Sequence, residues 1–528
     1  MKINTHFTEN DYRDFKARGI SVDEIETQIE KFVRGTRPVT LNRAAVIDDG
    51  VLRLGKNELD DYVRQFNSAE AAGRITKFVP ASGAASRMFK TLLSALNEEN
   101  PPDWRERMAA AKRGHALYGK IREFIINLPR FAFYNDLKIA LAQSGADLDS
   151  LIKTGDYDKI ITALLFPDGL NYANLPKGLI KFHQYPGGSR TPFAEHLVEA
   201  AAYARDRQGL ARLHFTIPVD QHLQQKIRAH IESVGRRLKN DGVDFEIGYS
   251  IQKSSTDTLA VDLENRPFRA PDGKILFRPG GHGALLENLN DLRGDIIFIK
   301  NIDNVAPDRL KHDTILYKKA LGGYLVSLQA AIFSYLKALS TGSVDARLWR
   351  EMVDFAVEKL SIDFPENIKS ASRTQQAGYL FEKFNRPLRV CGMVKNEGEP
   401  GGGPFWVEDA AGNISLQVVE TAQIDSADPA QQKILASATH FSPVDFVCGV
   451  RDFRGQPFDL HKFRDPDSGF IAIKSQNGRE LKALELPGLW NGGMAYWNSV
   501  FVEVPGSTFT PVKTVFDLLR PQHQPATV

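Results

Sequence analysis

The chain has 528 residues, of which 42% are hydrophobic and 25% are charged. This composition is typical of an ordinary globular protein that is large enough for one big core and a deep substrate cleft. Because 67 basic and 65 acidic residues leave a formal charge of only +2, nothing global indicates a nucleic-acid partner, and any phosphate binding must be local.

Cysteine content and hydropathy bear on the compartment. Two cysteines, Cys391 and Cys448, cannot form a disulfide framework, and no Cys/His cluster has zinc-ligand spacing. The first residues lack the apolar run of a signal peptide, and no stretch reaches the roughly 18 apolar residues of a membrane span. We therefore expect a soluble, cytoplasmic protein without a membrane partner.

The first 170 residues are predicted to be mostly helical. Ile25, Ile29 and Phe32 recur at helical spacing within residues 1–70, which predicts a helical leader that packs on the core. Residues 75–80 are strand-like, and the small residues after them predict a turn followed by a helix. From about 91 to 170 the pattern is helical again, without a strand signal, and indicates a helical insertion.

Strand-like and helix-like segments alternate in the middle of the chain, which predicts an α/β sheet with ligands at the carboxyl ends of its strands. The strand-like segments are 213–218, 244–252 and 295–305, and the helix-like segment is 220–240. Helices dominate from 310 to about 385, and short strands follow, with a hairpin expected around Gly412. We expect one core over 71–450, which 451–528 completes.

The first candidate motif is VPASGAASRMFK, residues 79–90. Small residues after a strand let backbone N–H groups approach phosphates, and the following helix adds its positive end. Ser82, Gly83 and Ala84 are therefore candidate nucleotide-binding residues, and Arg87 adds a formal charge as a candidate catalytic residue. A tight structural turn would explain the same residues equally well.

The segment 272–305 contains the densest pattern. Glycines beside His282, including Gly281 and Gly283, permit a backbone that touches a flat nucleobase or ribose. A helix then leads into an apolar strand that is followed by Asp303, and a carboxylate at a strand end can hold Mg²⁺ between phosphates. The competing interpretation is that Asp303 caps a turn.

Two lysines follow prolines, Lys177 in LPKGLIKF and Lys513 in STFTPVKTVFDLLR. An ammonium group at such a site would offset the charge that develops on a transferred phosphoryl group. A solvated surface lysine and an amphipathic helix are the respective alternatives.

Taken in order, these motifs resemble the eukaryotic-type UDP-sugar pyrophosphorylases over roughly residues 75–519. The resemblance implies a Rossmann-like mixed sheet of the nucleotide-diphospho-sugar transferase (GT-A-like) type. It also implies that Gln252 lies in the nucleotide site and that Glu420 and His440 line the sugar site, whereas an edge-strand carboxylate and a packed histidine are the structural alternatives. The chain is also identified as a member of the uncharacterised bacterial family of unknown function numbered 4301.

The activity that this resemblance implies is the joining of a nucleoside triphosphate, probably UTP in this family, to a sugar 1-phosphate with release of pyrophosphate. Arg87, Lys177 and Lys513 would surround the phosphates, and Asp303 would hold Mg²⁺. Two alternatives stay open: a nucleotide-sugar-dependent glycosyltransferase, although such enzymes usually carry Asp-x-Asp where this chain has Asn-x-Asp at 301–303, and a non-catalytic nucleotide-sugar-binding protein. The sugar and the oligomeric state are not determined by the sequence.

Overall fold

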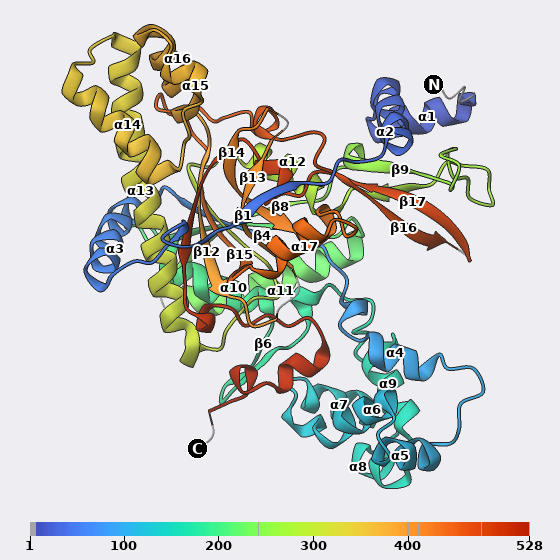
Figure 1. The fold of residues 1–528 in the computed structure, drawn as a ribbon. Helices are drawn as coiled ribbons and strands as arrows, with labels where there is room; N and C mark the ends of the chain where they lie inside the picture. Colours follow the sequence, from blue (N-terminus) through green and yellow to red (C-terminus); the bar gives the residue numbers. More distant parts are fainter. Residues whose placement is uncertain (1–6, 241, 399–400, 410, 477, 527–528) are drawn as a thin grey trace. The chain divides into compact units, whose positions relative to one another are not determined.

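The computed structural model describes residues 7–240, 242–398, 401–409, 411–476 and 478–526. Its contacts define two compact units, each assembled from three segments of the chain. Unit 1 comprises Met1–Phe78, Ser250–Ile299 and Tyr317–Pro505, and unit 2 comprises Val79–Tyr249, Lys300–Leu316 and Gly506–Val528. Figure 1 shows the helices and strands of both units. No helix within the described ranges is long and apolar enough to cross a membrane.

Unit 1 contains a large mixed sheet with the strand order β2-β3-β18-β12-β15-β11-β4. Strands β3, β18 and β12 run parallel to one another, β12 and β15 are antiparallel, and β11 and β4 are parallel. The strands are β2 (Val46–Ile47), β3 (Gly50–Leu52), β4 (Ile75–Pro80), β11 (Ile296–Lys300), β12 (Leu388–Lys395), β15 (His440–Gly449) and β18 (Asn498–Glu503). The predicted mixed α/β class is therefore confirmed.

Different helices cover the two faces of this sheet. On β12, Cys391 joins an apolar core with Leu289 of helix α12 (Leu285–Leu292). At the next position, a Cβ on Gly392 would lie 3.4 Å from Leu321 of helix α13 (Lys311–Thr341). Because successive side chains of a strand point to opposite faces, α12 and α13 cover opposite faces of the sheet. This cover explains why every residue of β11 is buried.

A second sheet of unit 1 has the order β10-β9-β17-β16 and packs against the first two helices (Figure 1). Its strands are β9 (Asp257–Val261), β10 (Phe277–Pro279), β16 (Phe470–Gln476) and β17 (Arg479–Glu485), and the helices are α1 (Glu9–Arg18) and α2 (Val22–Arg34). The predicted apolar stripe of Ile25, Ile29 and Phe32 is buried in one core with Leu259 and Leu484. Capping boxes begin both helices, so local sequence and packing favour the same structure.

The predicted hairpin around Gly412 is confirmed in a third sheet, of order β1-β13-β14. Its strands are β1 (Thr40–Ala44), β13 (Gly402–Glu408) and β14 (Ile414–Glu420). The prediction of an entirely helical leader over 1–70 is wrong for β1, β2 and β3. These short strands form because they pair with β13 and β18, which lie far away in the sequence and leave no local signal.

The remaining helices of unit 1 lie mainly where the sequence predicts helices between 310 and 385. They are α3 (Lys56–Ala71), α14 (Ala346–Leu360), α15 (Glu366–Lys369), α16 (Arg373–Phe384) and α17 (Pro429–Ala436).

Unit 2 contains a run of helices between 90 and 165, where the sequence predicts an insertion (Figure 1). They are α4 (Lys90–Leu96), α5 (Trp104–Lys112), α6 (Ala116–Ile126), α7 (Tyr134–Gln143), α8 (Leu148–Thr154) and α9 (Tyr157–Leu165). Phe124, Phe131 and Phe133 are fully buried among them, and the rings of Phe131 and Phe133 stack with centroids 5.0 Å apart.

The rest of unit 2 combines short strands with two long helices. They are β5 (His183–Tyr185), β6 (Gly188–Arg190), α10 (Pro192–Tyr203), β7 (Leu210–Thr216), α11 (Gln221–Lys239) and β8 (Asp244–Ser250). The predicted strand at 213–218, helix at 220–240 and strand at 244–252 correspond to β7, α11 and β8. Thr191 caps α10 and Pro192 follows at its first position, the preferred place for proline in a helix.

Candidate functional site

The small-residue loop after β4 lies beside the segment that carries Lys177. The N–H of Ala85 donates to the Leu175 carbonyl at 2.9 Å, and the N–H of Lys177 donates to the Gly83 carbonyl at 3.1 Å. Gly83 and Ala84 are exposed, and a Cβ built on Gly83 would meet no atom within 4 Å. Packing therefore does not require a glycine at 83, which leaves the loop surface open to a ligand.

Two lysines converge on one carboxylate in unit 2. The Nζ atom of Lys177 donates to Oδ2 of Asp303 at 2.9 Å, and Nζ of Lys513 donates to the same oxygen at 3.1 Å. Asp303 is 7% exposed, whereas the side chain of Lys513 is 60% exposed. The structure thus brings together three residues that the sequence singled out separately.

Backbone hydrogen bonds hold this cluster in place. Strand β11 ends at Lys300, and the turn after it receives the N–H of Val512 on the Asp303 carbonyl at 3.1 Å. The N–H of Thr510 donates to Oδ1 of Asn304 at 3.0 Å, and Lys177 Nζ also donates to the Val512 carbonyl at 2.6 Å. The proline-lysine segment near the C-terminus is therefore fixed against the turn that carries Asp303.

The charges of the cluster favour an anion. Burial alone would raise the pKa of Asp303, but the ammonium groups of Lys177 and Lys513 outweigh it and hold that pKa below its ordinary value. Asp303 is therefore ionised at neutral pH. Two positive charges against one negative charge leave a net charge of +1 beside an exposed loop, which suits a phosphate group.

Arg87, the third predicted cation, is exposed in the short 3-10 turn Ala85–Arg87. It lines a shallow depression of about 460 Å³ together with Ser86, Lys90 and Asn97. Among the contacts of the described residues, none joins Arg87 to Asp303. The structure therefore does not bring Arg87 into the lysine–aspartate cluster.

A second cluster, in unit 1, is centred on His282. Its ring stacks on the indole of Trp490 with centroids 4.0 Å apart, and its Nε2 lies 3.1 Å from Oε1 of Glu420. The indole N–H of Trp490 donates to the same Glu420 oxygen at 3.1 Å. The glycine-flanked histidine and the carboxylate predicted for the sugar site thus lie in direct contact.

The hydrogen bonds fix the protonation of this histidine. The backbone N–H of Leu489 donates to Nδ1 of His282 at 3.0 Å, so Nδ1 is an acceptor and the ring proton is on Nε2, facing Glu420. Burial would raise the pKa of Glu420, but the hydrogen bonds from His282 and Trp490 lower it below its ordinary value. Glu420 is therefore an ionised acceptor.

The glycines around His282 have a structural reason. A Cβ on Gly280 would lie 2.6 Å from the Thr256 carbonyl oxygen, and one on Gly283 would overlap the carbonyl oxygen of Pro487. Gly281 has a φ of 74°, in the left-handed region that favours glycine. The close approach at these positions is made by the protein's own backbone, so the glycine content alone is no evidence of a nucleobase.

Gln252 and His440, also in unit 1, lie in different surroundings. Nε2 of Gln252 is buried and has no hydrogen-bond partner among the described residues. His440 is 3% exposed, accepts or donates a hydrogen bond with Thr439 at 2.8 Å, and lies 3.5 Å from Glu503. No contact among the described residues joins His440 to Glu420, and its contacts are those of a packed histidine.

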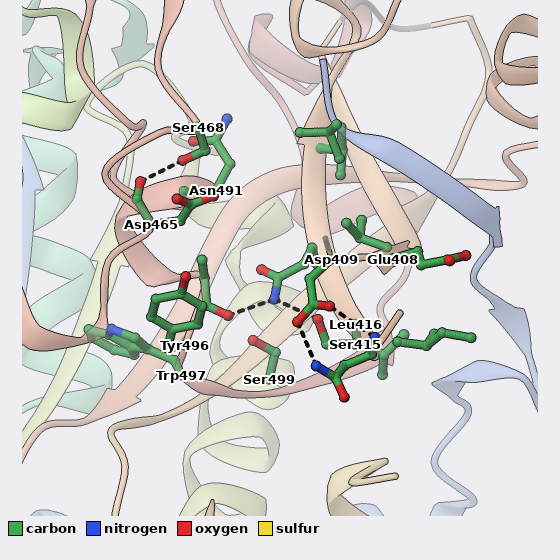
Figure 2. A pocket seen from close by; sticks show the side chains of 18 of the residues that line it. Glu408, Asp409, Ser415, Leu416, Asp465, Ser468, Asn491, Tyr496, Trp497 and Ser499 are labelled. Carbon is green, nitrogen blue, oxygen red and sulfur yellow. Dashed lines mark hydrogen bonds between the residues drawn. The ribbon is translucent and has the colours of Figure 1, made fainter. Parts of the chain in front are cut away.

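A cavity of about 780 Å³ is a separate feature of unit 1 (Figure 2). Ser415 of the β13–β14 hairpin, Tyr496, Ser499 and Lys383 of α16 are among the residues that line it. Of the described residues on its walls, none is a site residue that the sequence predicted. We therefore do not include it in the candidate site.

Sequence reasoning missed Trp490 and the buried polar face of α10. Trp490 stands between glycines in LPGLWNGG, so an aromatic residue in a turn was its only signal. On α10, Glu195, His196 and Glu199 are all fully buried, and Lys300 donates to Glu199 at 2.8 Å. Their helical spacing reads as an ordinary solvated face, because the sequence does not show which face of a helix is covered.

Comparison with known proteins places the chain in a family. Residues 8–524 match a family described as a domain of unknown function (DUF4301). The chain belongs to this family. No curated protein sequence matches it.

Two solved structures are similar to this DUF4301 chain. The uridine diphosphate N-acetylglucosamine pyrophosphorylase from Trypanosoma brucei has 12% identity and a TM-score of 0.45, over 98% of this chain and 80% of its own. The UDP-glucose pyrophosphorylase from Leishmania major has 10% identity and a TM-score of 0.42, over 96% of this chain and 77% of its own. Similarity at this level does not carry a functional argument.

Proposed function

We propose that this protein is a nucleotidyltransferase, on a GT-A-like Rossmann core, that joins a nucleoside triphosphate to a sugar 1-phosphate and releases pyrophosphate. The family resemblance of the motifs makes UTP the first candidate. The observation that carries the proposal is the convergence of Lys177 and Lys513 on the buried carboxylate of Asp303, next to an exposed loop whose Gly83 packing does not require.

The chemistry of this reaction suits such a cluster. A sugar 1-phosphate oxygen attacks the α-phosphorus of the triphosphate, and the bond to the bridging oxygen of the β-phosphate breaks, so that pyrophosphate leaves with the bonding electrons. No covalent enzyme intermediate is required. Lys177 and Lys513 would neutralise the phosphate oxygens, and the backbone at 82–84 would orient them.

The residues present fit a Mg²⁺ ion that arrives with the triphosphate. Magnesium in phosphoryl-transfer sites is held by one or two carboxylates together with phosphate oxygens and water. In the part of the chain that the structure describes, no group of three or more His, Cys, Asp or Glu side chains could hold a metal by itself, so Asp303 would supply the protein ligand. A bound Mg²⁺ would neutralise charge on the triphosphate.

Residues of unit 1 would recognise the rest of the substrates. Gln252 presents a buried amide N–H group without a partner among the described residues, and a nucleoside carbonyl would satisfy it. Glu420, ionised and held by His282 and Trp490, would accept a hydrogen bond from a sugar hydroxyl. His440 is a weaker candidate for the sugar site, because its contacts are those of a packed side chain.

The test is a matrix of nucleoside triphosphates against sugar 1-phosphates, with and without Mg²⁺, and with detection of released pyrophosphate. Pyrophosphate release from at least one pair, with loss of activity in Lys177→Met and an unchanged rate in Lys226→Met, would support the proposal. Lys226 is an exposed lysine of α11 and serves as the matched control. Release of nucleoside diphosphate from a nucleotide sugar, or nucleotide binding without turnover, would overturn it in favour of a glycosyltransferase or a non-catalytic binding protein.

A further inference from the structure

A chain of buried hydrogen bonds in unit 2 has no place in the chemistry proposed above. Nδ1 of His523 lies 2.9 Å from Nε2 of His183, and Nδ1 of His183 lies 2.8 Å from Oε1 of Glu195. Lys311 donates to Oε2 of the same carboxylate at 2.6 Å. All four side chains are at most 4% exposed. Burying so many ionisable groups is costly unless each is paired, so their arrangement is specific.

This chain of hydrogen bonds joins the two segments whose other ends meet at the lysine–aspartate cluster. His523 belongs to the segment Gly506–Val528, which also carries Lys513, and Lys311 belongs to the segment Lys300–Leu316, which also carries Asp303. Glu195 of α10 lies between them. The C-terminal segment is held a second time by Arg309, whose Nη2 donates to the Gln524 carbonyl at 3.2 Å.

The contact between the two imidazoles limits how many protons they can carry. Glu195 is ionised and can only accept, so Nδ1 of His183 carries a proton. The 2.9 Å contact between the rings then requires one donor and one acceptor nitrogen. This condition holds when both rings are neutral or when His183 alone is charged. If both rings were charged, two N–H groups would face each other and the contact would break.

The charges around the pair oppose a proton on His523. Burial, followed by His183 and the nearby cations, lowers the pKa of His523 to about 3. Burial would raise the pKa of Glu195, but His183 and Lys311 outweigh it and lower that pKa. The titratable and charged groups that face the pair are Tyr185 of β5, Arg190 of β6, Glu195 of α10, Asp308 and Arg309 of the turn before α13, Lys311 of α13, and Arg520.

We propose that His523 and His183 are positioning residues for Lys513: their contact holds the C-terminal segment in place while His523 is neutral, and protonation of His523 releases that segment. The release would withdraw Lys513 from Asp303. The link to catalysis rests on the proposed function, in which Lys513 binds phosphate, but the docking of the segment does not.

The size of the effect follows from proton uptake. A released His523 would have the ordinary histidine pKa of about 6.5, whereas the docked residue stays neutral. Each pH unit below about 6.5 therefore weakens docking roughly tenfold, because the released state gains a proton that the docked state excludes. Between pH 7.5 and 5.5 we expect about a tenfold loss.

The experiment is amide hydrogen exchange of the full chain at pH 7.5 and 5.5, corrected for intrinsic rates, over residues 506–524. In the wild type, protection of amides such as Val512 should fall about tenfold at pH 5.5. His523→Asn keeps an N–H donor at the position of Nδ1 but does not titrate, so its protection should not depend on pH. His523→Leu removes the donor and should lose protection at both pH values. His222→Asn, at an exposed histidine of α11, should behave as the wild type.

Sulfate, whose charge is constant over this pH range, reports on the lysines. Its affinity should fall at pH 5.5 in the wild type but not in His523→Asn. The inference is overturned if wild-type protection is the same at both pH values, or if His523→Asn keeps the wild-type dependence. Because neither measurement needs turnover, failure to release pyrophosphate would reject the proposed function and leave this inference standing.

Discussion

The Nζ atom of Lys177 lies 2.9 Å from Oδ2 of Asp303, although 126 residues separate them in the sequence. Lys177 also donates to the Val512 carbonyl, next to Lys513, which contacts the same carboxylate. Each lysine thus keeps the other's partner in place. Removing any one of the three changes the charge that the other two present to a phosphate.

Lys177→Met should lower kcat/KM by about 10²–10³-fold, the usual cost of losing one charged contact to a transferring phosphoryl group. It should also raise the pKa of Asp303, because one of the two ammonium groups that lower it is lost. Steady-state kinetics with the best substrate pair would measure the first effect. Equal kinetics in Lys177→Met and the control Lys226→Met would show that Lys177 does not act on substrate.

Asp303→Asn should abolish Mg²⁺-dependent turnover and leave the fold intact, because the amide keeps the shape of the carboxylate. The two lysines would lose their shared counter-ion, so inorganic pyrophosphate without Mg²⁺ should bind more tightly than to the wild type. Calorimetric titration and thermal unfolding would measure both. A collapsed melting transition would identify Asp303 as structural, and weaker pyrophosphate binding would contradict an anion site.

Two glycine substitutions separate ligand contact from packing. Gly283→Ala should destabilise unit 1 by about 1–3 kcal/mol or more, because the added Cβ overlaps the Pro487 carbonyl oxygen. Gly83→Ala meets open space and should be neutral or stabilising by up to about 1 kcal/mol, while lowering activity if backbone at 83 contacts phosphate. Urea unfolding and kinetics on both variants would test this. Unchanged activity in Gly83→Ala would remove residue 83 from the site.

Trp490→Phe should raise the pKa of Glu420, because the indole N–H that helps to lower it is removed. In the wild type the folded protein holds the pKa of Glu420 below its ordinary value, so this residue stabilises the fold above about pH 4.5 and less as pH falls further. The variant should therefore lose less stability than the wild type between pH 7 and 4. Urea unfolding at both pH values would measure it, with Trp349→Phe of α14 as the control.

The sequence by itself determined the elements whose signals are local. Helix α2 follows from its apolar stripe and capping box, and the hairpin of β13 and β14 follows from the turn at Gly412. Lys177, Asp303 and Lys513 could each be singled out because proline and strand-end patterns are readable along the chain.

Only the tertiary structure decided what these residues contact. Strands β1, β2 and β3 were missed because their partners lie far away in the sequence, where no local pattern records pairing. The same physical reason applies to the site: the convergence of two lysines on Asp303, the stack of His282 on Trp490, and the buried pair of His183 and His523 are contacts between distant segments. Chain folding creates these contacts, and residue identity alone does not reveal them.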